Sequence, residues 1–171
     1  MTGLKNRFSC RVRIYGAPHN PSNRRPLAYP VQHPKLGRLM QTLILYLVTA
    51  AVFLGLDAIM LRTVMRPLFA AHIGDMLAKE LRIVPAALFY LAYVGGVLWF
   101  VSLPALREGA PVNALLAGAA LGAMAYGTYE FTNYATLRNW HWQMVAVDVT
   151  WGAVLTGFSA WVGVLAARAW G

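Results

Sequence analysis

Charged residues are scarce in this 171-residue sequence, and acidic residues are the scarcest of them. Only 12% of the residues are charged, and only 6 are Asp or Glu. A soluble globular chain carries roughly 25% charged residues, about twice this fraction. Because 58% of the residues are apolar, the composition indicates a membrane protein, and the length suits one domain.

Cysteine and the familiar catalytic signatures are also nearly absent. Cys10 is the single cysteine, so the chain cannot form an internal disulfide. The sequence contains no nucleophile elbow, phosphate loop, HExxH or CxxC pattern. His72 with Asp75, and His141 with Asp148, have spacings that do not define a metal site. We therefore expect no metal and no cofactor.

Acidic residues are missing altogether from the first 38 residues, which are basic and rich in proline. We predict that residues 1–38 form a disordered basic tail, because frequent prolines prevent a helix and little apolar surface is available to bury. Translation from Met40 is an alternative, in which the tail is an extension. The net charge of +9 resides largely in this tail, so it indicates attraction to anionic lipid and not a nucleic-acid partner.

Four long apolar runs follow the tail, and each is long enough to cross a bilayer as a helix, which needs about 20 residues. They predict an all-α integral membrane protein, a four-transmembrane-helix bundle over residues 39–168. The predicted helices span 39–61, 83–105, 112–137 and 142–167.

The stretch 62–82 is too polar to span, but its apolar residues recur at intervals of three and four. This period predicts an amphipathic interfacial segment between helices 1 and 2, lying flat on the membrane surface. The apolar positions are Met65, Phe69, Ile73, Met76 and Leu77.

Small residues at Ala114, Gly118 and Gly122 give the third predicted helix a face that another backbone can approach closely. Packing within the fold is the simplest role of this face. A homo-oligomer formed through the Gly118/Gly122 face is the alternative.

Basic residues suggest an orientation. With the tail included, the side that holds both termini has ten of them and the opposite side has five. The positive-inside rule then places the termini in the cytoplasm of a cell with this protein in its inner membrane. If translation starts at Met40, the count is two against five and the orientation reverses.

Three carboxylates interrupt the apolar runs: Asp57, Glu130 and Asp148. At about 1.5 Å of rise per residue, Glu130 lies about 10 Å and Asp148 about 9 Å from the turn that joins their helices. Asp57, near the end of the first helix, faces the same side. An acid inside a bilayer costs at least about 2.5–3.5 kcal/mol, so it is a functional candidate by default.

Helical spacing predicts which residues accompany the acids. Tyr126 and Asn133 share a face with Glu130, and Trp151 shares a face with Asp148, with His141 two turns before it. Tyr90 and Tyr93 could supply hydroxyl groups from the second helix. Carboxylates a few ångströms apart in a low dielectric cannot all ionise, so we expect at least one to hold a proton.

Structural interpretations compete with a functional one. Asp57 could pair with Arg62 in the headgroup layer, Glu130 with Asn133, and Asp148 with Arg138. Trp140 and Trp142 suit anchors at the membrane interface.

The segments TYEFTNYATLRNW (128–140) and DVTWG (148–152) resemble the signature of a bacterial membrane family catalogued as domain of unknown function 2177. The sequence departs from that signature at Glu130, where the family pattern has Asp. The resemblance implies a four-helix inner-membrane protein of about residues 40–168 and brings no activity with it.

Three functions remain open at this point. The first is a small-ligand binding or proton-linked transport protein that uses the carboxylates, with a cation or a hydrogen-bonding amphiphile, such as a lipid, as ligand. The second is an intramembrane enzyme that acts on a lipid or other apolar substrate by carboxylate acid–base chemistry. The third is a structural or assembly partner in the bilayer.

Overall fold

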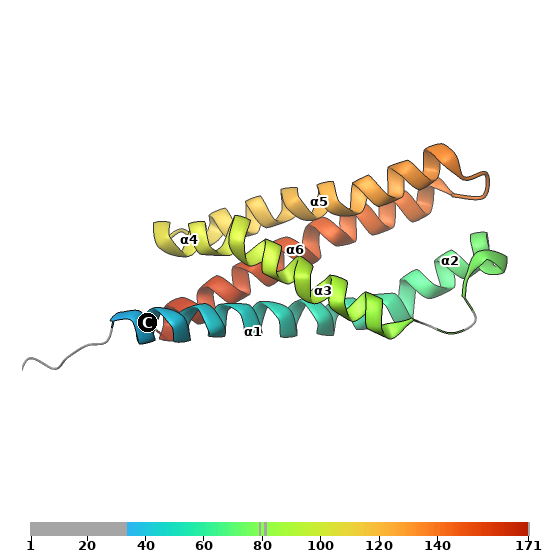
Figure 1. Cartoon of the computed structure of the whole chain (residues 1–171). Coiled ribbons are helices and arrows are strands. Elements are labelled where there is room, and N and C mark those ends of the chain that lie inside the picture. The colour runs from blue at the N-terminus through green and yellow to red at the C-terminus, as the bar shows by residue number, and fades with distance from the viewer. Residues whose placement is uncertain (1–33, 79, 81, 171) are drawn as a thin grey trace, which may run out of the picture. The chain divides into compact units, whose positions relative to one another are not determined.

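The computed structural model describes residues 34–78, 80 and 82–170, and these residues form helices joined by short turns (Figure 1). Every secondary-structure element in the described residues is a helix, which confirms the all-α class that the sequence predicts. The predicted tail lies outside the described residues up to position 33. In chain order the helices are α1 (Pro34–Met60), the π-helix η1 (Leu61–Met65), α2 (Arg66–Ile73), the 3₁₀ helix η2 (Gly74–Met76), α3 (Ile83–Val97), the π-helix η3 (Leu98–Ser102), α4 (Leu103–Glu108), α5 (Pro111–Thr136) and α6 (Trp142–Trp170).

The boundaries of α1 correct the sequence prediction at both ends. The helix begins at Pro34 and not at Leu39, because proline is tolerated in a first helical turn, where its missing N–H has no partner to lose. At the other end the chain stays helical beyond Leu61, through η1 and α2 to Ile73. At about 1.5 Å per residue this helical stretch is roughly twice as long as the ~30 Å hydrocarbon core.

Two π-helices explain why prolines failed to end the helices. η1 and η3 each lie directly before a short α-helix that has Pro67 or Pro104 in its first turn. A proline inside a helix removes one hydrogen bond and crowds the preceding turn, and a π-bulge accommodates both effects. The prediction that the second helix stops near Pro104 is therefore wrong. It ends at Glu108, followed by Gly109 with a left-handed backbone (φ 67°).

The antiparallel helices α5 and α6 pack most closely, along glycines. A Cβ atom added to Gly122 would lie 2.1 Å from the carbonyl oxygen of Gly152, and one added to Gly118 would lie 2.9 Å from Cα of Gly157. The Gly118/Gly122 face is therefore occupied by α6 of the same chain. This corrects the suggestion that it mediates a homo-oligomer: small residues on α6 match those on α5, a complementarity that one helix alone cannot reveal.

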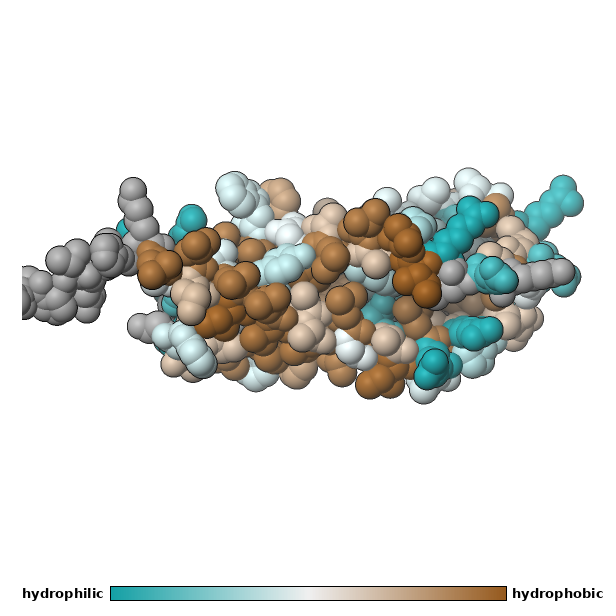
Figure 2. Space-filling view, turned by 60° about the horizontal axis from the view of Figure 1, so that its bottom comes forward, coloured by the Kyte–Doolittle hydropathy of each residue, from teal (hydrophilic) through white to brown (hydrophobic). Residues whose placement is uncertain are grey.

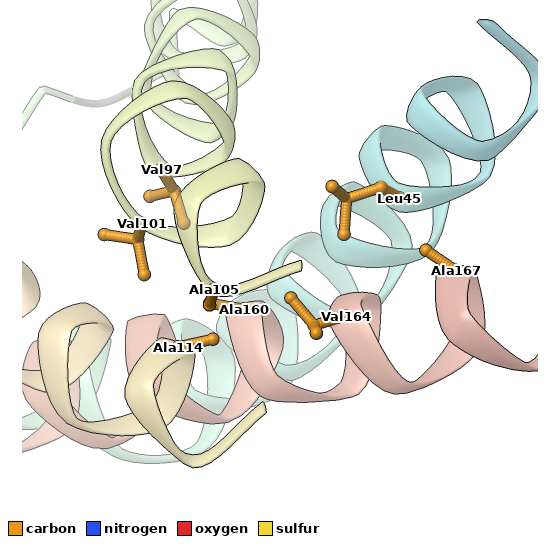
Figure 3. Packing of buried hydrophobic residues seen from close by; sticks show 8 residues of the cluster. All are labelled: Leu45, Val97, Val101, Ala105, Ala114, Ala160, Val164 and Ala167. Atoms are coloured by element: carbon orange, nitrogen blue, oxygen red, sulfur yellow. The ribbon is translucent and has the colours of Figure 1, made fainter. Parts of the chain in front are cut away.

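The first half of α1 packs against the C-terminal part of α6. Thr49 approaches Gly163, and the Gln41 side chain donates a hydrogen bond to the Ala167 carbonyl at 3.1 Å. Near this end Arg168 donates to the carbonyl of Gly109 at 3.1 Å, so the start of α1, the end of α6 and the α4–α5 turn lie at one end of the bundle. Figure 3 shows the apolar cluster that joins these helices here. Its buried members are Leu45, Val97, Val101, Ala105, Ala114, Ala160, Val164 and Ala167.

α2 packs against the turn between α5 and α6 at the other end of the bundle. Ile73 is buried there with Trp140, Met144 and Val145, and the Phe69 ring meets the Trp140 ring edge-on at 5.5 Å. Three of the five predicted apolar positions thus face protein or are shielded by it, while Met76 and Leu77 are exposed. The amphipathic pattern is present, and its principal partner in the structure is the helical hairpin.

Exposed apolar side chains cover much of the bundle. Figure 2 shows hydrophobic residues along one face and hydrophilic residues gathered toward the end that carries α2. By length and composition, three helical stretches of the described chain could cross a membrane: 36–76, 83–108 and 142–170. α5 has 26 residues but is not among them, since glycine, tyrosine and threonine dilute its apolar residues.

Candidate functional site

Three acids from three helices approach one another inside the bundle. Asp57 comes from α1, Glu130 from α5 and Asp148 from α6. Glu130 is fully buried, Asp57 is 4% exposed, and Asp148 is half-buried. Asp148 interacts electrostatically with both other carboxyl groups. The structure therefore brings together the three acids that the sequence places at similar depth.

Basic partners are missing from this cluster. Among the residues that the structure describes, no lysine, arginine or histidine forms an ion pair with any of the three acids. Asp57 forms no ion pair with Arg62, because its side chain is buried in the bundle beside Trp151. The pairings with Asn133 and Arg138 are likewise not formed.

An indole donates to each of the two most buried acids. The Trp140 Nε1–H donates to Glu130 Oε2 at 2.7 Å, and the Trp151 Nε1–H donates to Asp57 Oδ1 at 3.1 Å. Trp140 is 6% exposed, so the prediction that it is an interfacial anchor is wrong. Its neighbour Trp142 is 58% exposed, as an anchor would be. Trp140 lies in the short turn between α5 and α6, where the chain returns toward Glu130.

The second carboxyl oxygen of Glu130, Oε1, has no ordinary hydrogen-bond donor. Oε1 is buried and receives no hydrogen bond from an amide, hydroxyl or indole donor of the described chain. The Asp148 carboxyl nevertheless lies within hydrogen-bonding reach of Glu130. These two observations agree if a proton is present, because two ionised carboxylates have no donor between them and one protonated carboxyl supplies it.

The second oxygen of Asp57 is similarly free. No donor of the described residues reaches Oδ2 with hydrogen-bonding geometry. The Tyr90 hydroxyl is close enough to interact with the carboxyl, at a looser geometry than a formed hydrogen bond. Tyr126 also interacts with Asp57 and with Asp148. Aromatic side chains therefore surround a carboxylate with an unused acceptor.

The predicted tyrosines line the same region from α3 and α5. Tyr93 and Thr156 share a hydrogen bond between their hydroxyl groups at 3.1 Å. The Phe53 ring lies 5.9 Å from that of Tyr90 and 5.6 Å from that of Tyr93. Tyr126 packs flat on Gly152, where an added Cβ would fall 2.2 Å from the ring. Of the predicted companions, Tyr90, Tyr126 and Trp151 lie beside the acids, whereas Tyr93 contacts Thr156 and Phe53.

His141 and Asn133 do not join it. His141 stacks on His72 with 4.6 Å between ring centroids, and its Nδ1 accepts the backbone N–H of Gln143 at 3.3 Å. Asn133 interacts with the hydroxyl of Tyr129. His72 was not predicted as a neighbour, because its contact depends on α2 folding back onto the hairpin. No group of three or more His, Cys, Asp or Glu residues in the described chain is arranged to hold a metal ion.

Comparison with known proteins identifies a family and no activity. Residues 42–165 match the family described as Predicted membrane protein (DUF2177). No curated protein and no solved structure matches the chain.

Proposed function

The chain belongs to this family of predicted membrane proteins, and from its carboxylate site we propose that it binds a small ligand in a manner linked to one proton. The observation that carries the proposal is the approach of the Asp148 carboxyl to Glu130, whose buried Oε1 has no hydrogen-bond partner in the described chain. A shared proton can leave when a cation arrives nearby, because the cation stabilises the ionised pair. A binding or proton-linked transport protein would use this exchange.

The membrane arrangement in this proposal has four crossings. α5 runs antiparallel to α6 along its length, from the Gly109 end to the hairpin turn, so it crosses wherever α6 does. Glu130 of α5 is buried in the carboxylate site, and the exposed Thr128 and Thr136 donate their hydroxyl hydrogens to carbonyl groups of their own helix, which lowers the cost of placing them in lipid. Because the start of α1 and the end of α6 lie at the same end of the bundle, both termini are on one side of the membrane in this arrangement, and the basic tail favours the cytoplasmic side of a bacterial inner membrane.

α2 extends the first crossing beyond the hydrocarbon layer. The helical stretch 36–76 is too long for one perpendicular crossing, and α2 carries Arg66 and His72. In this arrangement α2 lies at the interface and covers the end of the α5–α6 hairpin. It shields the Trp140–Glu130 contact from water.

The alternatives receive less support. An intramembrane enzyme would need both carboxyls to reach the reacting atoms of one substrate, and no observation favours a particular substrate. An assembly role through Gly118 and Gly122 is less supported, because α6 of the same chain covers that face.

The test uses full-length protein in proteoliposomes with a pH-sensitive dye inside. Sodium, magnesium, n-butylammonium, spermidine and a neutral amphiphile are added outside in turn. The proposal expects at least one of these probes to drive counterflow of protons, and Glu130→Gln and Asp148→Asn each to abolish it. Glu108→Gln and Asp75→Asn, which change exposed acids, are the matched controls. Proton flux that is the same in wild type and both site variants would contradict the proposal.

A further inference from the structure

Asp57 offers a buried acceptor that the described protein leaves unused. Its side chain is 4% exposed, Oδ1 accepts the Trp151 indole N–H, and Oδ2 has no partner. Leaving a buried polar atom without a hydrogen bond is unfavourable, and more so for a charged group. An incoming donor at Oδ2 would recover that free energy.

The charge of the site selects a cation. Asp57 and the Glu130–Asp148 pair place acidic groups inside the bundle, and among the described residues no basic side chain is paired with them. A charge within a bilayer is costly unless it is paired. An anion would add to the repulsion, and a neutral ligand would leave the charge unbalanced.

The lining of the site selects the kind of cation. Magnesium and calcium need about six to eight oxygen ligands, and no metal-binding group of three or more such side chains is present in the described chain. Around Asp57 the neighbours are instead Trp151, Tyr90 and Tyr126. The faces of aromatic rings attract an organic cation electrostatically.

From these contacts we propose that Asp57 binds a small organic ammonium ion. An N–H of the ammonium group donates to Asp57 Oδ2, and its alkyl part lies against the rings of Tyr90, Tyr126 and Trp151. The inference rests on the proposed function and deepens it by naming the class of ligand. It draws on four helices, because these residues come from α1, α3, α5 and α6.

Asp148 connects this site to the proton. It interacts with Asp57 on one side and with Glu130 on the other. An ammonium ion at Asp57 favours the ionised form of the Glu130–Asp148 pair, which then releases its proton to solvent. One positive charge enters and one leaves, so the total charge of the site is unchanged.

The experiment is isothermal titration of the full chain in lipid nanodiscs, with empty nanodiscs as the blank. The titrants are the chloride salts of n-butylammonium, tetramethylammonium, which has no N–H, and sodium. We expect saturable binding of n-butylammonium that is tighter than that of tetramethylammonium, and no sodium binding at the same concentrations. Asp57→Asn should weaken n-butylammonium binding by at least about tenfold, or 1.4 kcal/mol. Asp75→Asn, the same change at an exposed acid of η2, should leave it unchanged.

A second variant guards against misfolding of Asp57→Asn. Trp151→Phe keeps an aromatic ring but removes the indole N–H, so binding should weaken less than in Trp151→Leu, which removes the ring. Unchanged n-butylammonium affinity in Asp57→Asn, or sodium binding as tight as that of n-butylammonium, would overturn the inference.

Proton counting separates this inference from the proposed function. Titration in two buffers with different ionisation enthalpies measures the protons released per ammonium ion bound. Binding that needs Asp57 but releases no proton, even in wild type, supports the ammonium site and contradicts the proton linkage. Absence of ammonium binding, together with a proton shared by Glu130 and Asp148, overturns the ammonium site and leaves the proton linkage standing.

Discussion

Neutral indole donors hold two buried acids in this protein. Trp140 and Trp151 each donate to one carboxyl oxygen of these acids, and no amide, hydroxyl or indole of the described residues donates to the other oxygen. An arginine or lysine in the same place would neutralise the acid and form a buried ion pair. An indole fixes the position of the carboxyl without cancelling its charge, so the acid stays able to take a proton or a cation.

At the residue scale, removing the Trp140 N–H should destabilise the fold. Trp140→Phe leaves Glu130 Oε2 buried without a donor, which we expect to lower the free energy of unfolding by about 1–3 kcal/mol. Denaturant unfolding in detergent micelles, followed by circular dichroism, measures the change. Trp142→Phe is the matched control, and this exposed position should change stability by less than about 0.5 kcal/mol. Equal stability of both variants would contradict a structural role for the Trp140–Glu130 hydrogen bond.

The sequence predicted which acids meet but not how they are held. Depth follows from counting residues to the turn, and this count placed Glu130 and Asp148 in one layer. The donor to Glu130 lies ten residues later, within that turn, where the period of a single helix carries no information. Trp140 and Trp142 look alike in sequence, and only packing against Phe69 and Ile73 of α2 shows which one is buried.

At the scale of elements, glycines determine how closely α5 and α6 approach. Membrane helices gain little from burying apolar surface against each other, so close van der Waals packing carries much of their association. Gly118 and Gly122 of α5 meet Gly152 and Gly157 of α6. This contact sets the separation of the helices that carry Glu130 and Asp148.

Gly122→Ala should therefore destabilise the bundle. Its added methyl would overlap the Gly152 carbonyl, and overpacking of this kind costs about 1–3 kcal/mol. Gly55→Ala is the control, because nothing lies within 4 Å of its added methyl in α1. There alanine should be neutral or stabilising by up to about 1 kcal/mol through helix propensity. Thermal unfolding of both variants in detergent gives the comparison; a loss at Gly55 as large as that at Gly122 would argue against the packing explanation.

Two helix starts were predicted correctly, whereas the start of α1 and the ends of the first two predicted helices were not. Ile83 was predicted as the start of α3 and is confirmed, and α6 begins at Trp142 as expected. The ends at Leu61 and Pro104 were wrong, because polarity or a proline does not stop a helix when a π-bulge absorbs the disturbance.

At the scale of the whole molecule, the contacts at one end imply an even number of crossings. The start of α1 and the end of α6 are neighbours through Gln41 and Ala167. Composition alone identifies three candidate spans in the described chain. An odd number would separate these two ends, so α5 supplies the fourth crossing in our proposal.

Cysteine labelling tests this topology. In a Cys10→Ser background, single cysteines replace Glu108 and Asn139, which are exposed at opposite ends of α5. A membrane-impermeant maleimide added to intact cells and to inverted vesicles should label the two positions from opposite faces. Labelling of both from the same face would show that α5 does not cross.

The central claim is that Glu130 and Asp148 share one proton, and infrared spectroscopy of the protein in lipid bilayers tests it most directly. At neutral pH we expect a carbonyl band of a protonated carboxylic acid in the wild type. One component of this band should disappear in Glu130→Gln and equally in Asp148→Asn, since either amide removes the partner that shares the proton. A wild type without a protonated carboxyl, or a band that both variants leave unchanged, would contradict the account.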